Sequence, residues 1–266
     1  MKVYFSFMLN TFQSALAYRA NIVCELISCM ISIVIEVCLW KALYNNSEYV
    51  VTSVGNVGLQ EMITYAVVST LMSLVITNSV VNKLNDKVSS GQIAMDIIKP
   101  IKMRIYMFFE MLGQIAYDCI VKMIPLLICI WIFLGPIRIA NGMLIYFVIA
   151  IVNAIILNYL ITYILGLCAF WYIQAWQIGY VYQYIMILLS GSWIPLWFFP
   201  EILRNLIGFL PFNLIYYVPL SIFLGKYTYT ECYKFIGIQL LWIVICIIVE
   251  RFMWQRALRK LVIQGG

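Results

Sequence analysis

Polar side chains recur at helical spacing inside a long apolar segment between residues 106 and 134. They stand four residues apart and comprise Glu110, Gln114, Asp118 and Lys122. At this spacing they share one face of a helix, on which Asp118 and Lys122 can form an ion pair. Charged groups at membrane depth are costly, so each of them requires a partner or a function.

A second polar face is predicted in the apolar segment from Ala20 to Tyr44. Its members are Glu25, Cys29, Ser32 and Glu36. We use the name polar seam for the ionisable and amide groups of both faces: Glu25, Glu36, Glu110, Gln114, Asp118 and Lys122. The seam could line a translocation path or a subunit interface, and it could equally be structural hydrogen bonding between helices. A proton relay is a further alternative.

Motifs for catalysis and nucleotide binding are missing from the sequence. It holds no G-x-x-x-x-G-K-[ST] loop, no G-x-S-x-G and no H-E-x-x-H, and it has no histidine. The eight cysteines lie mostly in apolar segments and form no C-x-x-C pair, which favours free thiols over disulfides or metal ligands. We therefore predict no catalytic, cofactor-binding or metal site in this chain.

Apolar segments long enough to cross a bilayer must position the polar seam. The chain is 65% hydrophobic and 11% charged, far from the composition of a soluble domain. Apolar runs of about 18 or more residues predict membrane-spanning helices. We expect an all-α, polytopic membrane protein that forms one transmembrane domain over residues 1–266, with about six spans. These lie near residues 20–44, 60–81, 106–134, 142–170, from 179 onward, and 232–249.

The distribution of basic residues predicts the orientation of the chain. With six spans and the N-terminus inside, the inner segments hold eleven lysine and arginine residues and the outer segments hold five. Inner segments of membrane proteins carry this excess, so both termini should be cytoplasmic. We expect a multi-pass protein of the bacterial inner or plasma membrane. The net charge of +6 then reports topology and predicts no nucleic-acid partner.

The N-terminal segment 1–19 reads as an amphipathic helix on the membrane surface. The apolar positions Phe5, Met8, Leu9, Phe12 and Leu16 recur at three- and four-residue spacing. This pattern is typical of an interfacial helix. An irregular extension of the following span is the alternative.

Proline and glycine interrupt the apolar stretch from Ser190 to Lys226. It is too broken for one straight span and too apolar for a solvent loop, so we expect an outer, half-inserted pair of short helices between spans five and six. Two further full spans are the alternative. The candidate residues of this outer gate region are Trp193, Pro195, Pro200 and Pro211.

A lysine-rich segment, residues 82–102, is predicted to form a short cytoplasmic helix, a turn at Ser90-Gly91, and a second stretch that stops before Pro100. A helix with charged and apolar sides can dock into a groove of a soluble partner. An ordinary positively charged inner loop would explain the lysines equally well.

Ordered motifs along nearly the whole chain resemble the membrane-spanning permease subunit of an ABC transporter, in the six-span exporter class called type two. They include Y-R at Tyr18-Arg19, L-W-K-A-L-Y at Leu39–Tyr44, and T-Y at Thr64-Tyr65. The segment Ser89–Pro100 is similar to the cytoplasmic "G-x-I … D-L-L-x-P" loop of the family. Further matches are Gly166–Trp171, Gly191–Pro200, Leu210–Phe212 and the basic, glycine-terminated tail.

The resemblance implies partners and an energy source. It implies two cytoplasmic ATPase subunits that bind Mg-ATP, a second permease that is identical or related, and no cofactor bound by this chain. The loop between spans two and three would couple to the ATPase through Lys83, Asp86, Lys87, Gly91 and Asp96. Substrate would leave past the outer gate region, and the aromatic content suits an amphipathic or apolar cargo.

Three other functions stay open from the residues alone. The first is an ion-coupled secondary transporter that uses Glu110, Asp118 and Lys122, although no internal repeat is apparent. The second is an intramembrane enzyme that acts on lipid. The third is a scaffold or immunity protein without transport activity.

Overall fold

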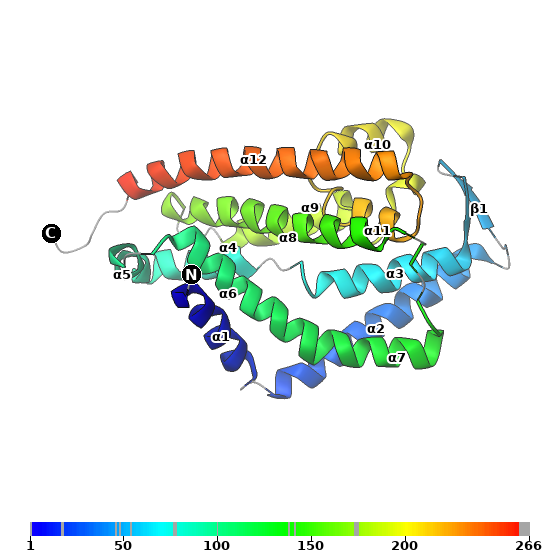
Figure 1. Ribbon diagram of the computed structural model, residues 1–266, viewed down its shortest axis with the longest axis horizontal. Helices are drawn as coiled ribbons and strands as arrows, with labels where there is room; N and C mark the ends of the chain where they lie inside the picture. The colour runs from blue at the N-terminus through cyan, green and yellow to red at the C-terminus, as the bar shows by residue number, and fades with distance from the viewer. Residues whose placement is uncertain are drawn as a thin grey trace.

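Helices dominate the computed structural model (Figure 1), as the apolar segments predict. The structure describes residues 2–16, 19–45, 47, 49–53, 55–76, 79–99, 101–137, 139–140, 142–172 and 176–260. Met1, Ala17, Tyr18, Pro100, Arg138 and the end of the tail, residues 261–266, were part of the sequence predictions and lie outside this description.

Four helical segments of the described chain are long and apolar enough to cross a membrane. The first is Ile22–Tyr44, within α2 (Arg19–Tyr44). The second, Met103–Leu134, joins α6 (Met103–Asp118), a π-helical turn (Cys119–Met123) and α7 (Ile124–Leu134). The third is α8 (Leu144–Leu167) with a short 3-10 turn (Cys168–Phe170), and the fourth is α12 (Tyr229–Lys260). These segments confirm a polytopic, helical membrane protein.

Two of the six predicted spans form shorter helices than expected. The predicted span 60–81 is divided between α3 (Leu59–Ser73) and the start of α4 (Ser79–Ser89). The predicted fifth span contains α9 (Trp176–Leu189). At about 1.5 Å per residue, α3 and α9 each extend about 22 Å, less than the hydrocarbon thickness of about 30 Å. Six spans therefore stay a prediction.

The π-helical turn lies directly before Pro125 in the second long segment. A proline inside a helix removes one backbone hydrogen bond and clashes with the preceding turn. A π-helical turn adds one residue to the turn and relieves that conflict locally. In Figure 1, α6 is inclined to the long axis whereas α7 runs along it, so the helix changes direction at this turn.

Helix α1 (Lys2–Leu16) packs along α6 partly with residues outside the predicted apolar face. Tyr4 stacks on Phe109 at 5.7 Å between ring centroids, and Phe7 meets Tyr106 at 4.7 Å. Of the predicted face, Phe5, Leu9 and Leu16 stay exposed. The helix has apolar residues on two sides: one side contacts α6, and the other stays exposed. A position at the membrane surface stays a prediction.

The predicted polar loop after the first span contains a two-stranded antiparallel hairpin. It consists of β1 (Tyr49–Thr52) and β2 (Gly55–Gly58), with Tyr49 opposite Gly58. The Tyr44 hydroxyl donates a hydrogen bond of 3.0 Å to the Val57 carbonyl and ties the hairpin to α2. We call this end of the molecule the hairpin end (Figure 1).

Short helices fill the proline-rich region 190–226. They are a 3-10 turn (Leu196–Phe198), α10 (Glu201–Gly208) and α11 (Tyr217–Phe223). Helix α11 is buried along most of its length, whereas α10 exposes Ile202 and Leu206. The region thus packs one short helix on protein and leaves another at the surface of the hairpin end. Insertion into the outer leaflet stays a prediction.

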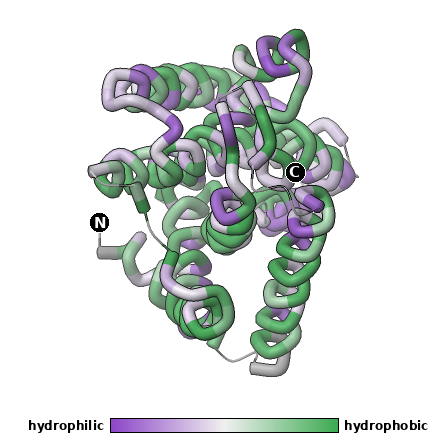
Figure 2. Tube along the Cα trace, turned by 90° about the vertical axis from the view of Figure 1, so that its right-hand side faces the viewer, coloured by the Kyte–Doolittle hydropathy of each residue, from purple (hydrophilic) through white to green (hydrophobic). Residues whose placement is uncertain are grey.

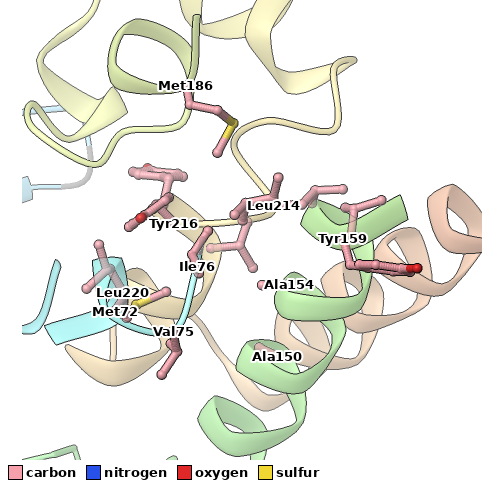
Figure 3. Close-up of a cluster of buried hydrophobic side chains, with 14 of the residues drawn as sticks. Met72, Val75, Ile76, Ala150, Ala154, Tyr159, Met186, Leu214, Tyr216 and Leu220 are labelled. Carbon is pink, nitrogen blue, oxygen red and sulfur yellow. The ribbon is translucent and has the colours of Figure 1, made fainter. Parts of the chain in front are cut away.

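The main core joins segments that are far apart in the sequence. Figure 3 shows Met72 and Ile76 facing Ala150 and Ala154 of α8, with Leu214 between the segments. A smaller cluster joins α2, α3 and α7 through Ile33, Val37, Ile63, Val67, Leu71, Leu126 and Ile130. Hydrophobic residues predominate along most of the helices (Figure 2), and many large ones are exposed, as expected for contact with lipid.

Gly113 of α6 allows the close approach of α1. A Cβ atom at this position would lie 2.3 Å from the Met8 carbonyl oxygen, which is a backbone atom and cannot rotate away. We expect Gly113→Ala to displace α1 and to lower the free energy of unfolding by about 1–3 kcal/mol.

The measurement is thermal unfolding of the purified chain in detergent, followed by tryptophan fluorescence. Gly237→Ala in α12 is the matched control, since a Cβ atom there meets nothing within 4 Å and alanine favours the helix by about 1 kcal/mol. Equal melting temperatures for the two variants would contradict the close packing of α1 on α6.

Candidate functional site

A polar cavity of about 510 Å³ lies between α2, α3, the π-helical turn and α9. We call it the polar chamber. Its wall combines Ser28, Cys29, Ser32 and Glu36 of α2, Ser69, Thr70 and Ser73 of α3, Asp118 and Lys122, Gln183 of α9, and Ser192. Hydroxyl, amide and charged groups thus gather inside a set of otherwise apolar helices. Such a gathering is a functional-site candidate, because polar groups are costly at membrane depth.

Lys122 is the centre of the charged part of the chamber. Its Nζ lies 2.6 Å from Asp118 Oδ1, one helical turn earlier, and also forms an ion pair with Glu25 of α2. Gln114 Nε2 donates to the Asp118 carboxylate at 3.3 Å. The sequence prediction of an Asp118–Lys122 pair is therefore confirmed, and the structure adds Glu25 as a partner from another helix.

Glu36 differs from the other acids of the seam. Within the described part of the chain its carboxylate has neither an ion pair nor a hydrogen bond, and it is half-buried. It also borders a second cavity of about 590 Å³, which is mostly apolar and includes Trp40, Leu43 and Phe198. Ser32, Glu36 and Trp193 line both cavities. Glu36 is thus the acidic group at the junction of a polar and an apolar cavity.

Glu110 leaves the predicted seam and belongs to another contact. Its Oε1 lies 3.4 Å from Nζ of Lys83 in α4, outside the polar chamber. The four-residue ladder is therefore divided between two partners. Its first member contacts α4, and the other three, Gln114, Asp118 and Lys122, form the charged group beside α2.

Helices α4 and α5 (Gln92–Ile98) form the lysine-rich segment, with Gly91 between them. Gly91 has a φ of 74°, a left-handed conformation that favours glycine. The predicted helix and turn are present as local structure, and the predicted second stretch forms α5. Val80, Val81 and Leu84 bury the inner face of α4, while Asp86 is exposed.

Asp96 holds the two short helices together. Lys87 Nζ of α4 lies 2.6 Å from Asp96 Oδ2, and Lys99 Nζ lies 2.7 Å from Oδ1. Burial acts to raise the pKa of Asp96, but the hydrogen bonds from both lysines outweigh it and lower the pKa overall. Burial likewise acts to lower the pKa of Lys87, and the Asp96 hydrogen bond reverses this and raises it.

These two pKa shifts define the pH range of the Lys87–Asp96 pair. A carboxyl whose pKa is lowered on folding stabilises the fold above its unfolded pKa, and the stabilisation is lost as the pH falls through the folded pKa. A lysine whose pKa is raised stabilises the fold below its unfolded pKa and loses that effect as the pH rises through the folded pKa. The pair therefore stays charged across neutral pH.

The predicted outer gate residues separate into different environments. Trp193 is exposed and lines both cavities, whereas Pro195 and Pro211 are buried and Pro200 is exposed at the start of α10. Two hydrogen bonds hold this region on α3: the Tyr65 hydroxyl donates to the Gly191 carbonyl, and Ser69 Oγ donates to the Ser192 carbonyl at 2.6 Å. Only Trp193 of the four therefore lies at the polar chamber.

Sequence reasoning missed the hydroxyl groups of α3 and the amide of α9. Ser69 and Ser73 stand four residues apart, and Thr70 lies beside them on the chamber wall. Hydroxyls at helical spacing give a weaker signal than ionisable groups, because a hydroxyl is less costly to place in an apolar helix and can bond to the carbonyl one turn earlier. Sequence reasoning also missed the ion pair between Arg104 of α6 and Glu250 of α12, at 2.5 Å. The two residues are far apart in the sequence, so residue spacing gives no sign that they are in contact.

Comparison with known proteins identifies a family. A family model described as "ABC-2 family transporter protein" matches residues 10–265, which is nearly the whole chain. A search of curated proteins finds no match.

We expect Lys122→Met to destabilise the protein more than removal of the whole pair. The single change leaves Asp118, whose side chain is 9% exposed, without its cation, and loss of one partner of a buried pair costs roughly 3 kcal/mol or more. The double variant Asp118→Asn with Lys122→Met should recover part of this loss.

A double-mutant cycle measured by thermal unfolding in detergent checks this expectation. Lys41→Met, at the exposed end of α2, is the control and should change stability by less than about 0.5 kcal/mol. Strictly additive effects of the two single changes would show that Asp118 and Lys122 do not interact.

Proposed function

This chain belongs to the ABC-2 transporter family and is the membrane component of an ABC transporter, and we propose that it acts as the permease of an ATP-driven exporter. In this proposal the polar chamber is part of the path that the substrate takes through the membrane. Separate cytoplasmic subunits bind Mg-ATP and hydrolyse it, and a second permease, identical or related, completes the path. The protein lies in the plasma or inner membrane, with both termini in the cytoplasm.

The polar chamber is the observation that carries the proposal. Its wall includes six hydroxyl or acidic side chains from α2 and α3, which a helix packed only against lipid would not need. Structural hydrogen bonds between helices usually pair their groups directly. Here a volume of about 510 Å³ separates them, which is the size range of a small-molecule site.

Two adjoining cavities support an amphipathic cargo. The polar chamber offers hydroxyl, amide and charged groups, and the neighbouring cavity of about 590 Å³ offers Trp40, Leu43 and Phe198. A molecule with a polar and an apolar part would contact both cavities, with its polar part near Glu36. Trp193, which lines both, would contact it on the side of the hairpin end.

The low burial of α2 supports a second permease. Only 11% of its most apolar window is buried within the described chain, the lowest value of the four candidate spans. Ser28 and Ser32 are exposed on this helix, and Glu36 is half-buried. Lipid tails offer hydroxyl and carboxyl groups no hydrogen-bond partner. We therefore infer that another protein helix packs against this face of α2.

The arrangement of α4 and α5 supports docking to the ATPase. Asp86 and Ser89 point outward from α4, while Lys83 links α4 to α6 through Glu110. Lys87 Nζ also lies 5.1 Å from the centre of the Tyr106 ring, which in turn contacts Phe7 of α1. A force applied to α4 would therefore reach both α6 and α1 through direct contacts.

The proposed mechanism is rigid-body gating. ATP closes the ATPase dimer, which moves α4 and α5 of each permease. Helix α6 carries the movement to Asp118 and Lys122, at the wall of the polar chamber. The two permeases then change their contact along α2, α3 and α9, and the substrate leaves past the region of Trp193.

The ion-coupled carrier is less well supported. It would use Glu110, Asp118 and Lys122 as sites for a cation or a proton. Glu110 is paired with Lys83, and Asp118 is paired with Lys122. Paired groups at these positions fit structural links better than ion sites.

Copurification tests the proposed function directly. The tagged chain should recover an ATPase from mild detergent when it is expressed with its genomic neighbours, and a cysteine at Asp86 should crosslink to that ATPase. Ser47→Cys, beside the hairpin, is the matched control and should form no crosslink. Recovery of the chain alone, without nucleotide hydrolysis, would refute the ABC exporter.

Glu36→Gln tests whether the polar chamber is part of the substrate path. If Glu36 contacts cargo, we expect basal ATPase activity to remain and stimulation by transported substrate to fall about tenfold, as for loss of one charged hydrogen bond. The readout is ATPase activity of the reconstituted complex against substrate concentration. Glu201→Gln, an exposed acid at the start of α10 outside both cavities, is the control. Equal stimulation in wild type and Glu36→Gln would exclude this carboxylate from the path.

A further inference from the structure

A separate cavity of about 540 Å³ lies at the other end of the molecule from the hairpin. It is enclosed by the start of α6, the last part of α8 and the C-terminal part of α12. We call it the basic cavity. The residues that matter for its chemistry are Lys102, Arg104, Tyr163, Glu250, Arg251 and Trp254. None of them lines the polar chamber.

The acidic residues of the basic cavity are already neutralised. Glu250 forms an ion pair of 2.5 Å with Arg104, and Asp96 is held by Lys87 and Lys99. Lys102 and Arg251 are exposed and have no ion pair within the described chain. The cavity therefore presents an excess of positive charge, which favours an anionic ligand.

The side chain of Tyr163 independently indicates that the basic cavity binds a ligand. Its side chain is fully buried and lines the cavity, yet its hydroxyl has no hydrogen-bond partner among the described residues. A buried hydroxyl without a partner is costly, so such groups usually have an acceptor. An oxyanion in the cavity would supply one and would also contact Arg251.

The surroundings of the cavity favour a lipid as the source of that oxyanion. It lies at the same end of α8 and α12, two candidate spans, and therefore at the depth where a helix leaves the hydrocarbon. Half-buried Trp254 lines it, a residue typical of the headgroup level, and Leu258 gives it an exposed apolar border. Basic cavities between membrane helices on the cytoplasmic side suit anionic headgroups.

We propose that the basic cavity binds the phosphate group of an anionic phospholipid from the adjacent leaflet. The phosphate accepts hydrogen bonds from the Tyr163 hydroxyl and the Arg251 guanidinium, and Lys102 adds charge. Bound lipid would brace α6 against α12 beside the Arg104–Glu250 pair. The binding itself does not depend on the proposed exporter function.

Native mass spectrometry of the full-length chain, titrated with phosphatidylglycerol, tests this site. Phosphatidylcholine is the zwitterionic control, and inorganic phosphate is the soluble competitor. We expect Arg251→Ala and Tyr163→Phe each to weaken phosphatidylglycerol binding by roughly tenfold, the effect of losing one hydrogen bond to a charged group. Binding of phosphatidylcholine should be weak in all variants.

Arg256→Ala is the matched control. Arg256 has the same charge on the same helix, but it stacks on Phe252 and does not line the cavity. Its loss should change binding by less than about twofold, since a single exposed charge contributes little. Thermal unfolding of each variant confirms that the protein folds, and Tyr163→Phe keeps the ring in place.

Three results would overturn the proposal. Equal losses for Arg251→Ala and Arg256→Ala would indicate unspecific attraction to the surface. Inorganic phosphate that binds as tightly as the lipid would make a free anion the ligand. If the complex with its ATPase no longer bound phosphatidylglycerol and Arg251 crosslinked to the ATPase, the cavity would be part of a subunit interface.

Discussion

Hydrocarbon offers no hydrogen-bond partner, and this constraint decides how the long helices of the protein fit together. Several polar groups within them are satisfied by neighbouring segments. Gln239 of α12 is fully buried and donates to the carbonyls of Ala150 and Leu214, at 3.1 and 2.9 Å. Tyr182 of α9 donates to Asn158 of α8 at 2.8 Å, and Arg104 pairs with Glu250. These contacts specify which helices are neighbours, whereas the apolar core alone would allow several arrangements.

Helix α6 carries two kinds of contact along one face. In the middle of α6, Glu110 pairs with Lys83 of α4, and about three turns later Lys122 pairs with Glu25 of α2 beside the polar chamber. The same helix receives α1 at Gly113. In the proposed transporter, α6 is therefore a rigid link between the segment that docks to the ATPase and the cavity that holds cargo. The π-helical turn, which contains Lys122, is where the helix changes direction.

The sequence predicted those features that depend on local spacing. The long apolar helices, the Asp118–Lys122 pair and the break at Gly91 all follow from residue type and period within a few turns. It did not predict the division of the second span, the short strand pair after Tyr44, or the partners of Glu110 and Glu25. Those depend on contacts between segments that are distant along the chain. The contact of α1 with α6 was not predicted for the same reason, since a helix with apolar residues on two sides does not reveal which side meets protein.

The sparse packing of α2 also bears on how the cell produces this subunit. If the proposed second permease covers this helix, a chain inserted without it would leave the hydroxyls of Ser28 and Ser32 and the carboxylate of Glu36 without that cover. Incompletely folded proteins are removed by chaperones and proteases, so unassembled copies would then be short-lived. The lifetime of each subunit would then depend on the supply of the other. Assembly would regulate the amount of transporter in the membrane without any dedicated regulator.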